Sequence, residues 1–329
     1  MKKFRCRVWL LVVIVIFLFL GFSKYHLDRK LEMYPGLGLR DLHQTGINGA
    51  GISVAIIDQK LLVNHVEYVD RLVHYQELQP IDEPNSMHGP AVSSILVGKN
   101  CGVAPGADLH YWAVPVHGDE LPGIRYAQAI KDVISYNSSL PEKKRIRVLS
   151  ISSGFQKEDG GDQFLEAVEE AWDSGLLVFT STFPYFTDPI IAVYTAALKR
   201  GGSRDHIDDY IVPPLLVEYR GQTAEVIVRT RHQQGDGNVI YEPVWVPVEP
   251  RLLASQQGPR KYTLYSTGGD SWAPPYLAGV AALILQVNPR LSNKQVVEII
   301  AANTVENSGG LMIVSQGQAV IVAQEPIAP

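Results

Sequence analysis

Residues 51–58 read GISVAIID, and the expected architecture follows from this segment. The run Ile52–Ile57 is almost continuously apolar and is bounded by Gly51 and Asp58. A short apolar run between turn residues is typical of a strand buried on both faces of a sheet. Val148–Ile151 and Leu176–Thr180 have the same character. We therefore expect several strands of one buried, parallel sheet.

Helical patterns alternate with these strands. Between the strands at 148–151 and 176–180, apolar side chains recur at helical spacing and Gly175 closes the pattern. Leu277–Val287 is apolar almost all round, which predicts a helix through the core that is too short to span a bilayer. A further helix is expected after the cap residue Ser292. The order predicts an α/β protein of three layers, a mostly parallel twisted sheet with helices on both faces.

The composition excludes several classes of protein. The chain has 329 residues, of which 46% are hydrophobic, so general disorder is excluded. Two cysteines exclude a disulfide scaffold. A net charge of −5 supplies no basic surface for nucleic acid.

The N-terminus has the layout of a membrane-targeting segment. Met1–Arg7 carries four cations, and Val8–Phe22 follows without a charged residue. No small-x-small cleavage signature follows the run, which favours an uncleaved signal anchor at residues 1–22, with a transmembrane helix at 8–22. This predicts a single-pass protein of the cell membrane whose remainder lies outside the cytoplasm. The alternative is a cleaved signal and a secreted protein.

The rest of the chain divides into two segments. Residues 23–48 are polar and interrupted by Pro35, Gly36 and Gly38, which indicates a stalk. Residues 49–329 form the expected main domain. Within it, residues 185–265 differ in character, with a predicted hairpin that pairs Thr223–Arg229 with Val239–Trp245.

Three side chains suggest nucleophilic catalysis. Asp58 ends the first buried strand, and ligands of open α/β sheets bind beyond such strand ends. His88 precedes a helical pattern, and Ser271 begins the buried helix, where backbone donors favour negative charge on an attacked carbonyl. Each residue alone also has a structural explanation, as a turn or cap residue. Together they are the parts of a general-base triad.

The surrounding motifs resemble those of the subtilisin-like serine proteases, the subtilases. The aspartate motif is GISVAIID at 51–58, the histidine motif is MHGPAV at 87–92 with GVAPGA at 102–107, and the serine motif is GDSWAPPYLAG at 269–279. The chain order Asp, His, Ser is that of subtilisin. The resemblance implies that Asp58, His88 and Ser271 are catalytic. It also implies that Ser152, Ser153 and Gly154, in the segment SISSG at 150–154, bind substrate.

The sequence departs from the family pattern next to each of these residues. In the family, an asparagine after the strand at 176–180 donates a hydrogen bond to the oxyanion. Pro184 stands at that position here and has no N–H to donate. Losing one such donor lowers turnover about 10²–10³-fold, a magnitude measured in subtilisin itself. The backbone N–H of Ser271 and the hydroxyl of Thr182 are the candidate oxyanion donors that remain. The other departures are Gln59-Lys60 after the aspartate, Pro90 in the histidine motif, and Asp270 and Pro274 in the serine motif.

Two functions therefore remain open. The first is a serine endopeptidase that cleaves protein or peptide substrates through an acyl-enzyme. The second is a pseudoprotease, a catalytically impaired, membrane-tethered binding or regulatory module. We expect no cofactor, a monomer, and no globular pro-domain within residues 23–48. The histidines show no metal-type spacing, and calcium ligands cannot be assigned. A nucleotide-binding protein is disfavoured because no glycine-rich phosphate loop follows a strand.

Overall fold

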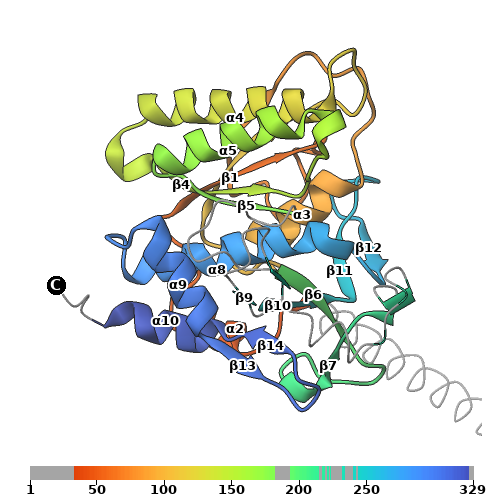
Figure 1. The fold of residues 1–329 in the computed structure, drawn as a ribbon, viewed down its shortest axis with the longest axis vertical. Coiled ribbons are helices and arrows are strands. Elements are labelled where there is room, and N and C mark those ends of the chain that lie inside the picture. Colours follow the sequence, from red (N-terminus) through yellow and green to blue (C-terminus); the bar gives the residue numbers. More distant parts are fainter. Residues whose placement is uncertain are drawn as a thin grey trace, which may run out of the picture.

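A computed structural model describes residues 33–181, 193–214 and 244–325, together with a few residues between 217 and 241. A parallel sheet lies at its centre, with helices packed on both faces (Figure 1). This confirms the predicted three-layer α/β architecture. The predicted anchor at residues 8–22 lies outside the described residues. Among the helices that are described, none has both the length and the apolar character needed to span a bilayer.

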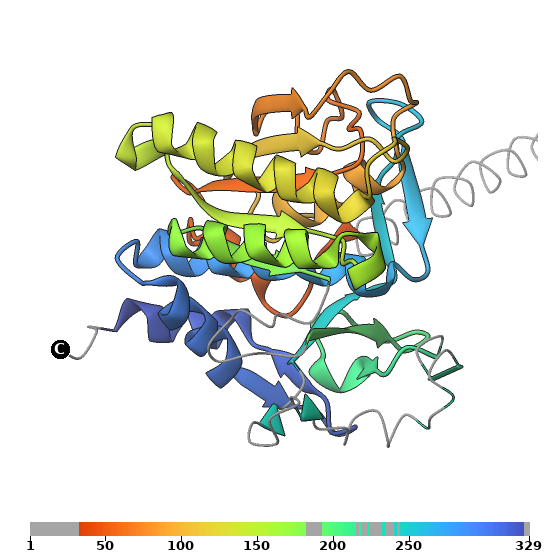
Figure 2. The same cartoon turned by 45° about the horizontal axis from the view of Figure 1, so that its top comes forward.

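The central sheet has five parallel strands in the order β2-β3-β1-β4-β5. Figure 2 shows α4 and α5 side by side on one face, and α3 and α8 cover the other. The bounds of these strands are β1 Ser53–Asp58, β2 Leu72–Glu77, β3 Asp108–Ala113, β4 Ile146–Ile151 and β5 Leu177–Thr180. The helices are α3 His88–Val97, α4 Pro122–Ser139, α5 Gly161–Asp173 and α8 Ala273–Val287.

Strand β1 is apolar from Val54 to Ile57 because its alternate side chains enter two different cores. Val54 and Ile56 belong to the core between the sheet and α3 and α8. Ala55 and Ile57 belong to the core beneath α4 and α5. Successive side chains of a strand point to opposite faces, so a strand covered on both sides needs apolar residues at every position. All six residues of β1 are accordingly buried.

A second sheet has the order β13-β14-β10-β6-β7. Strand β10 (Val244–Glu249) runs parallel to β6 and β14, and after Pro250 the chain forms an antiparallel hairpin of β11 (Arg251–Ala254) and β12 (Tyr262–Tyr265). The remaining bounds are β6 Val193–Leu198, β7 Tyr210–Ile211, β8 His232–Gln233, β9 Ile240–Tyr241, β13 Thr304–Glu306 and β14 Met312–Val314.

The predicted hairpin around residue 236 needs correction. The sequence pattern predicts that Val244 and Trp245 lie in its returning arm. In the structure they begin β10 and pair in parallel with Val193 and Tyr194 of β6. Both residues are buried, because β10 is a central strand of the second sheet. Within residues 217–241, the antiparallel pair that the structure describes is the short one of β8 and β9. Most of the predicted outgoing arm, Thr223–Arg229, lies outside the described residues.

The ends of the described chain pack on the same core. Residues 23–48 were expected to be a stalk, yet they include α2 (Leu39–Gln44), whose Leu39 is fully buried. At the other end, α9 (Asn293–Ala302) begins with a capping box between Ser292 and Gln295, as the cap residue predicts. Helix α10 (Gln316–Gln324) follows and packs against α8.

Helix α8 approaches the 102–104 segment through Gly279. A β-carbon at Gly279 would lie 2.5 Å from Cβ of Val103, closer than side chains tolerate. We therefore expect Gly279→Ala to lower the free energy of unfolding by about 1–3 kcal/mol through overpacking, despite the better helix propensity of alanine. Urea denaturation of the full chain measures the change.

Gly317→Ala in α10 is the matched control, because no atom lies within 4 Å of a β-carbon there. It should leave stability unchanged or raise it by up to about 1 kcal/mol. Equal losses in the two variants would contradict the packing explanation.

Candidate active site

Asp58 ends β1 at the carboxyl edge of the sheet, where its side chain is almost fully buried. Its oxygens Oδ1 and Oδ2 lie 2.8 and 2.9 Å from Nδ1 of His88. The backbone N–H of Gln59 donates a further hydrogen bond of 2.7 Å to Oδ1. A buried carboxylate needs such partners, because leaving it without them would carry a large desolvation cost. The structure thus brings together the first two residues of the predicted triad.

His88 is the first residue of α3, as the helical pattern after it predicts. Burial by itself would lower the pKa of His88, but the charge of Asp58 and the hydrogen bond to it raise the pKa above its ordinary value. With Nδ1–H directed at the carboxylate, the neutral ring presents Nε2 as an acceptor. The pair is therefore arranged as a general base with its orienting carboxylate.

Gln59, which differs from the residue usual in the subtilase motif, helps to hold the turn before His88. The hydroxyl of Ser86 donates to Oε1 of Gln59, and Oγ of Ser86 accepts the backbone N–H of His88 at 2.9 Å. The side chain that follows Asp58 therefore helps to fix the start of α3. Pro90 fits the first turn of the same helix, because N–H groups there have no intrahelical partner.

Ser271 lies in a 3-10 turn, η4 (Gly269–Trp272), which corrects the prediction that it begins the buried helix. Helix α8 starts two residues later, at Ala273. Oγ of Ser271 donates to the carbonyl oxygen of Ser152 at 3.4 Å, and Oγ of Ser152 donates to the carbonyl oxygen of Ser271 at 2.6 Å. The turn η4 contacts α3, yet no hydrogen bond joins Ser271 and His88, both of which are described. Two members of the triad are paired, and the third is bonded elsewhere.

The predicted substrate segment directly follows β4, beside Ser271. Ser152 is buried against Ser271, whereas Gly154 is exposed. Oγ of Ser153 donates to the Tyr126 hydroxyl at 3.3 Å, and the Ser153 carbonyl accepts the N–H of Ser181 at 3.3 Å. The segment therefore runs from the nucleophile candidate toward the end of β5.

The oxyanion question falls on residues that are not described. Thr182 and Pro184 both lie outside the described residues. Ser181, the last described residue before them, donates from Oγ to the carbonyl oxygen of Asp270 at 3.4 Å. Asp270 itself is exposed.

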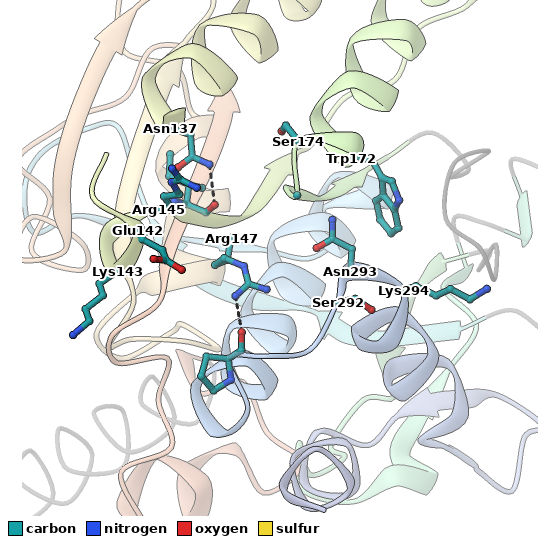
Figure 3. Close-up of a pocket in the computed structure, with 13 residues that line it drawn as sticks. Asn137, Glu142, Lys143, Arg145, Arg147, Trp172, Ser174, Ser292, Asn293 and Lys294 are labelled. Carbon is teal, nitrogen blue, oxygen red and sulfur yellow. Dashed lines mark hydrogen bonds between the residues drawn. The ribbon is translucent and has the colours of Figure 1, made fainter. Parts of the chain in front are cut away.

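A hollow of about 790 Å³ lies at the opposite edge of the sheet, away from these residues (Figure 3). It is lined by the starts of β4 and α9 and by residues that follow α4 and α5. Four of its residues are cations, Lys143, Arg145, Arg147 and Lys294. Arg147 donates to the carbonyl oxygens of Pro289 and Leu291, at 2.9 and 3.0 Å, so it ties β4 to the turn before α9. Cations near the C-terminal ends of α4 and α5 offset the partial negative charge of those ends.

No group of three or more metal-ligating side chains is found in the described part of the chain. One residue that sequence reasoning missed lies close to Ser271. Oε1 of Glu249 accepts the backbone N–H groups of Gly268 and Gly269, at 2.8 and 3.0 Å. The sequence held only a weak signal for it, an acidic residue at the end of an apolar run.

Comparison with known proteins finds similarity to the subtilases. The profile of the subtilase family matches residues 49–182. Serine protease AprX of Bacillus subtilis is 26% identical over 288 residues, which cover 78% of this chain and 62% of that protein. Subtilisin-like protease PopC of Myxococcus xanthus is 28% identical over 282 residues, covering 80% and 58%. The chain thus spans about three fifths of the length of these relatives.

A solved structure, that of the subtilase cytotoxin SubAB assembly, has the same fold. It superposes with a TM-score of 0.63 at 13% identity, covering 89% of this chain and 96% of that one. The parallel sheet of this protein is therefore that of a subtilisin-like α/β fold. The profile match and the two relatives, together with the shared fold, support a subtilase-like family for this chain.

Proposed function

We propose that the protein is a serine endopeptidase that cleaves peptide bonds through Asp58, His88 and Ser271. The observation that carries the proposal is the pairing of both Asp58 oxygens with Nδ1 of His88. That pairing gives the imidazole the tautomer and the raised pKa that a general base needs. The similarity to the subtilase family and to a serine protease supports a serine peptidase activity.

The proposed reaction requires Ser271 to exchange its hydrogen-bond partner. Its hydroxyl donates to the Ser152 carbonyl, so rotation of the side chain toward Nε2 of His88 must precede attack. Nε2 then takes the hydroxyl proton as Oγ bonds to the substrate carbonyl carbon. Collapse of the tetrahedral intermediate breaks the C–N bond, and His88 returns the proton to the leaving amine. Water repeats the cycle on the acyl-enzyme and releases the acid.

The substrate would lie extended along Ser152, Ser153 and Gly154. This segment follows β4, and its exposed end leads away from Ser271. The backbone N–H of Ser271 and the hydroxyl of Thr182 would stabilise the oxyanion. We further propose that residues 8–22 anchor a monomer in the cell membrane with this domain outside the cytoplasm, or that a cleaved signal releases it. The charge pattern of residues 1–22 supports the anchor.

A fluorophosphonate probe tests the nucleophile, because it bonds covalently to an activated serine. The full chain should be labelled at Ser271, and Ser271→Ala should abolish the label, since Ser271 is the proposed nucleophile of the Asp58–His88 pair. Mass spectrometry of the labelled peptide identifies the site.

Ser174→Ala is the matched control, because Ser174 belongs to the hollow at the opposite edge of the sheet. It should keep the label in full. A folded wild-type chain that takes no label would overturn the peptidase proposal and favour the pseudoprotease, the binding or regulatory module.

The pH dependence of labelling tests His88. Only the neutral imidazole accepts the Ser271 proton, so the rate should rise with pH and level off above the pKa of His88. Because Asp58 raises that pKa, the midpoint should lie above the ordinary histidine value of about 6.5.

Asp58→Asn removes the carboxylate charge and should shift the midpoint to lower pH. It should also slow labelling on the order of 10⁴-fold by favouring the wrong tautomer. A midpoint that is the same in both proteins would show that Asp58 does not control the titrating group.

A further inference from the structure

We propose that Glu249 is a positioning residue that holds the Gly268–Gly269 segment and thereby sets the place of Ser271. The inference rests on the proposed function for its catalytic consequence. Its structural part, the fixing of the segment before Ser271, stands on the geometry of Glu249 alone.

Glu249 lies where the chain leaves the second sheet. The chain returns to this place after the hairpin, at Gly268. It is the last residue of β10, and the β11–β12 hairpin separates it from Gly268. Arg251 and Tyr265 are paired in that hairpin, and beyond this pair Oε1 of Glu249 receives both glycine N–H groups. One carboxylate oxygen thus closes the base of the hairpin and fixes the segment that enters η4.

The carboxylate of Glu249 is buried at its contact with Gly268 and Gly269. Glu249 is only 2% exposed, and the ion pairs recorded among the described residues do not include it. Burial raises the pKa of Glu249 above its ordinary value, while the hydrogen bonds with the backbone of Gly268 and Gly269 and with the side chain of Thr267 act in the opposite direction. A buried carboxyl without a counter-ion depends on N–H donors, so the side chain and the backbone segment stabilise each other.

A second contact restrains the same segment. The ring of Trp272 lies so close to Gly268 that a β-carbon there would be 1.8 Å from Cδ2 of the ring. Trp272 is buried and packs edge-on against Tyr265 at a ring separation of 5.4 Å. Gly269 has a φ of +59°, a conformation that favours glycine. Ser271 therefore lies between two fixed points, the glycines held by Glu249 and the indole.

These restraints bear on reactivity because Ser271 is two residues from the nearer glycine. Its hydroxyl has to reach Nε2 of His88 from a turn whose entry is tied to the second sheet, whereas Asp58 and Ser152 belong to the first. Without the Glu249 contact, the turn would sample other positions, and the fraction of time in which Oγ meets His88 would fall. Misplacement of a reacting group lowers a rate steeply.

Two readouts on the full-length protein test the proposal, and only one depends on activity. Hydrogen–deuterium exchange of the peptide covering 266–272 reports the glycine N–H bonds. The rate of fluorophosphonate labelling reports the position of Ser271. Glu249→Ala should speed exchange of the two glycine amides about tenfold or more and slow labelling by a similar factor.

Glu249→Gln keeps an oxygen acceptor of the same length and should leave both readouts within about threefold of wild type. Glu249→Asp keeps the charge but falls one methylene short, so it should behave like Glu249→Ala. It also carries the test if the alanine variant does not fold.

Glu67→Ala is the matched control. Glu67 is also 2% exposed, and its carboxylate accepts hydrogen bonds from the Asn100 N–H and the Tyr262 hydroxyl, at 2.8 and 2.7 Å. The substitution therefore removes a buried carboxylate that contacts Tyr262, at the start of β12. Its exchange at 266–272 and its labelling rate should match wild type.

The outcomes separate the two proposals. Equal effects of Glu67→Ala and Glu249→Ala, or unchanged exchange in Glu249→Ala, would overturn the role of Glu249. Faster exchange with an unchanged labelling rate would overturn its link to Ser271. If the wild-type chain takes no label, the endopeptidase proposal fails, and faster exchange in Glu249→Ala still supports Glu249 as the anchor of this segment.

Discussion

Asp58 ends a strand whose six residues are all buried, so its carboxylate has to find its partners within the protein. Removing a charge from water is costly unless hydrogen bonds and opposite charge replace the lost solvation. The N–H of Gln59 and the ring of His88 supply that replacement. This requirement places the start of α3 at the end of β1, and the Gln59–Ser86 contact secures it. The same burial that makes the strand part of the core thus creates the Asp58–His88 pair.

The nucleophile candidate is held differently. Asp58 ends β1 and Ser152 directly follows β4, and two packed cores set the positions of these strands. Ser271 instead lies in a short turn, whose entry is tied to the second sheet through Glu249 and whose exit is the buried helix α8. The site therefore joins a half that belongs to the central sheet with a half that is held by Glu249 and by the buried ring of Trp272.

The sequence predicted the parts of the protein that depend on local pattern. The buried strand at 52–57, the core helix at 277–287 and the cap at Ser292 follow from periodicity and end signals, and each is present with small shifts in its bounds. Asp58 and His88 followed from their places at the end of a strand and the start of a helix.

Contacts between distant segments were beyond the sequence. The apolar run at 244–249 looks the same in a hairpin arm and in a central parallel strand, so the assignment of Val244 and Trp245 was wrong. Glu249 looked like an ordinary strand-end residue because its partners lie 19 and 20 positions further along the chain. The 3-10 turn that holds Ser271 depends on packing between distant segments, which no local sequence pattern indicates.

The contact between Gly268 and Trp272 also limits the order in which substitutions can accumulate here. Any side chain at 268 would overlap the indole, so a larger residue there is acceptable only after Trp272 has been replaced by a smaller one. The reverse order passes through an intermediate with a steric clash beside the reactive turn. The two positions therefore have to change in sequence, and mutational paths that begin at 268 are closed.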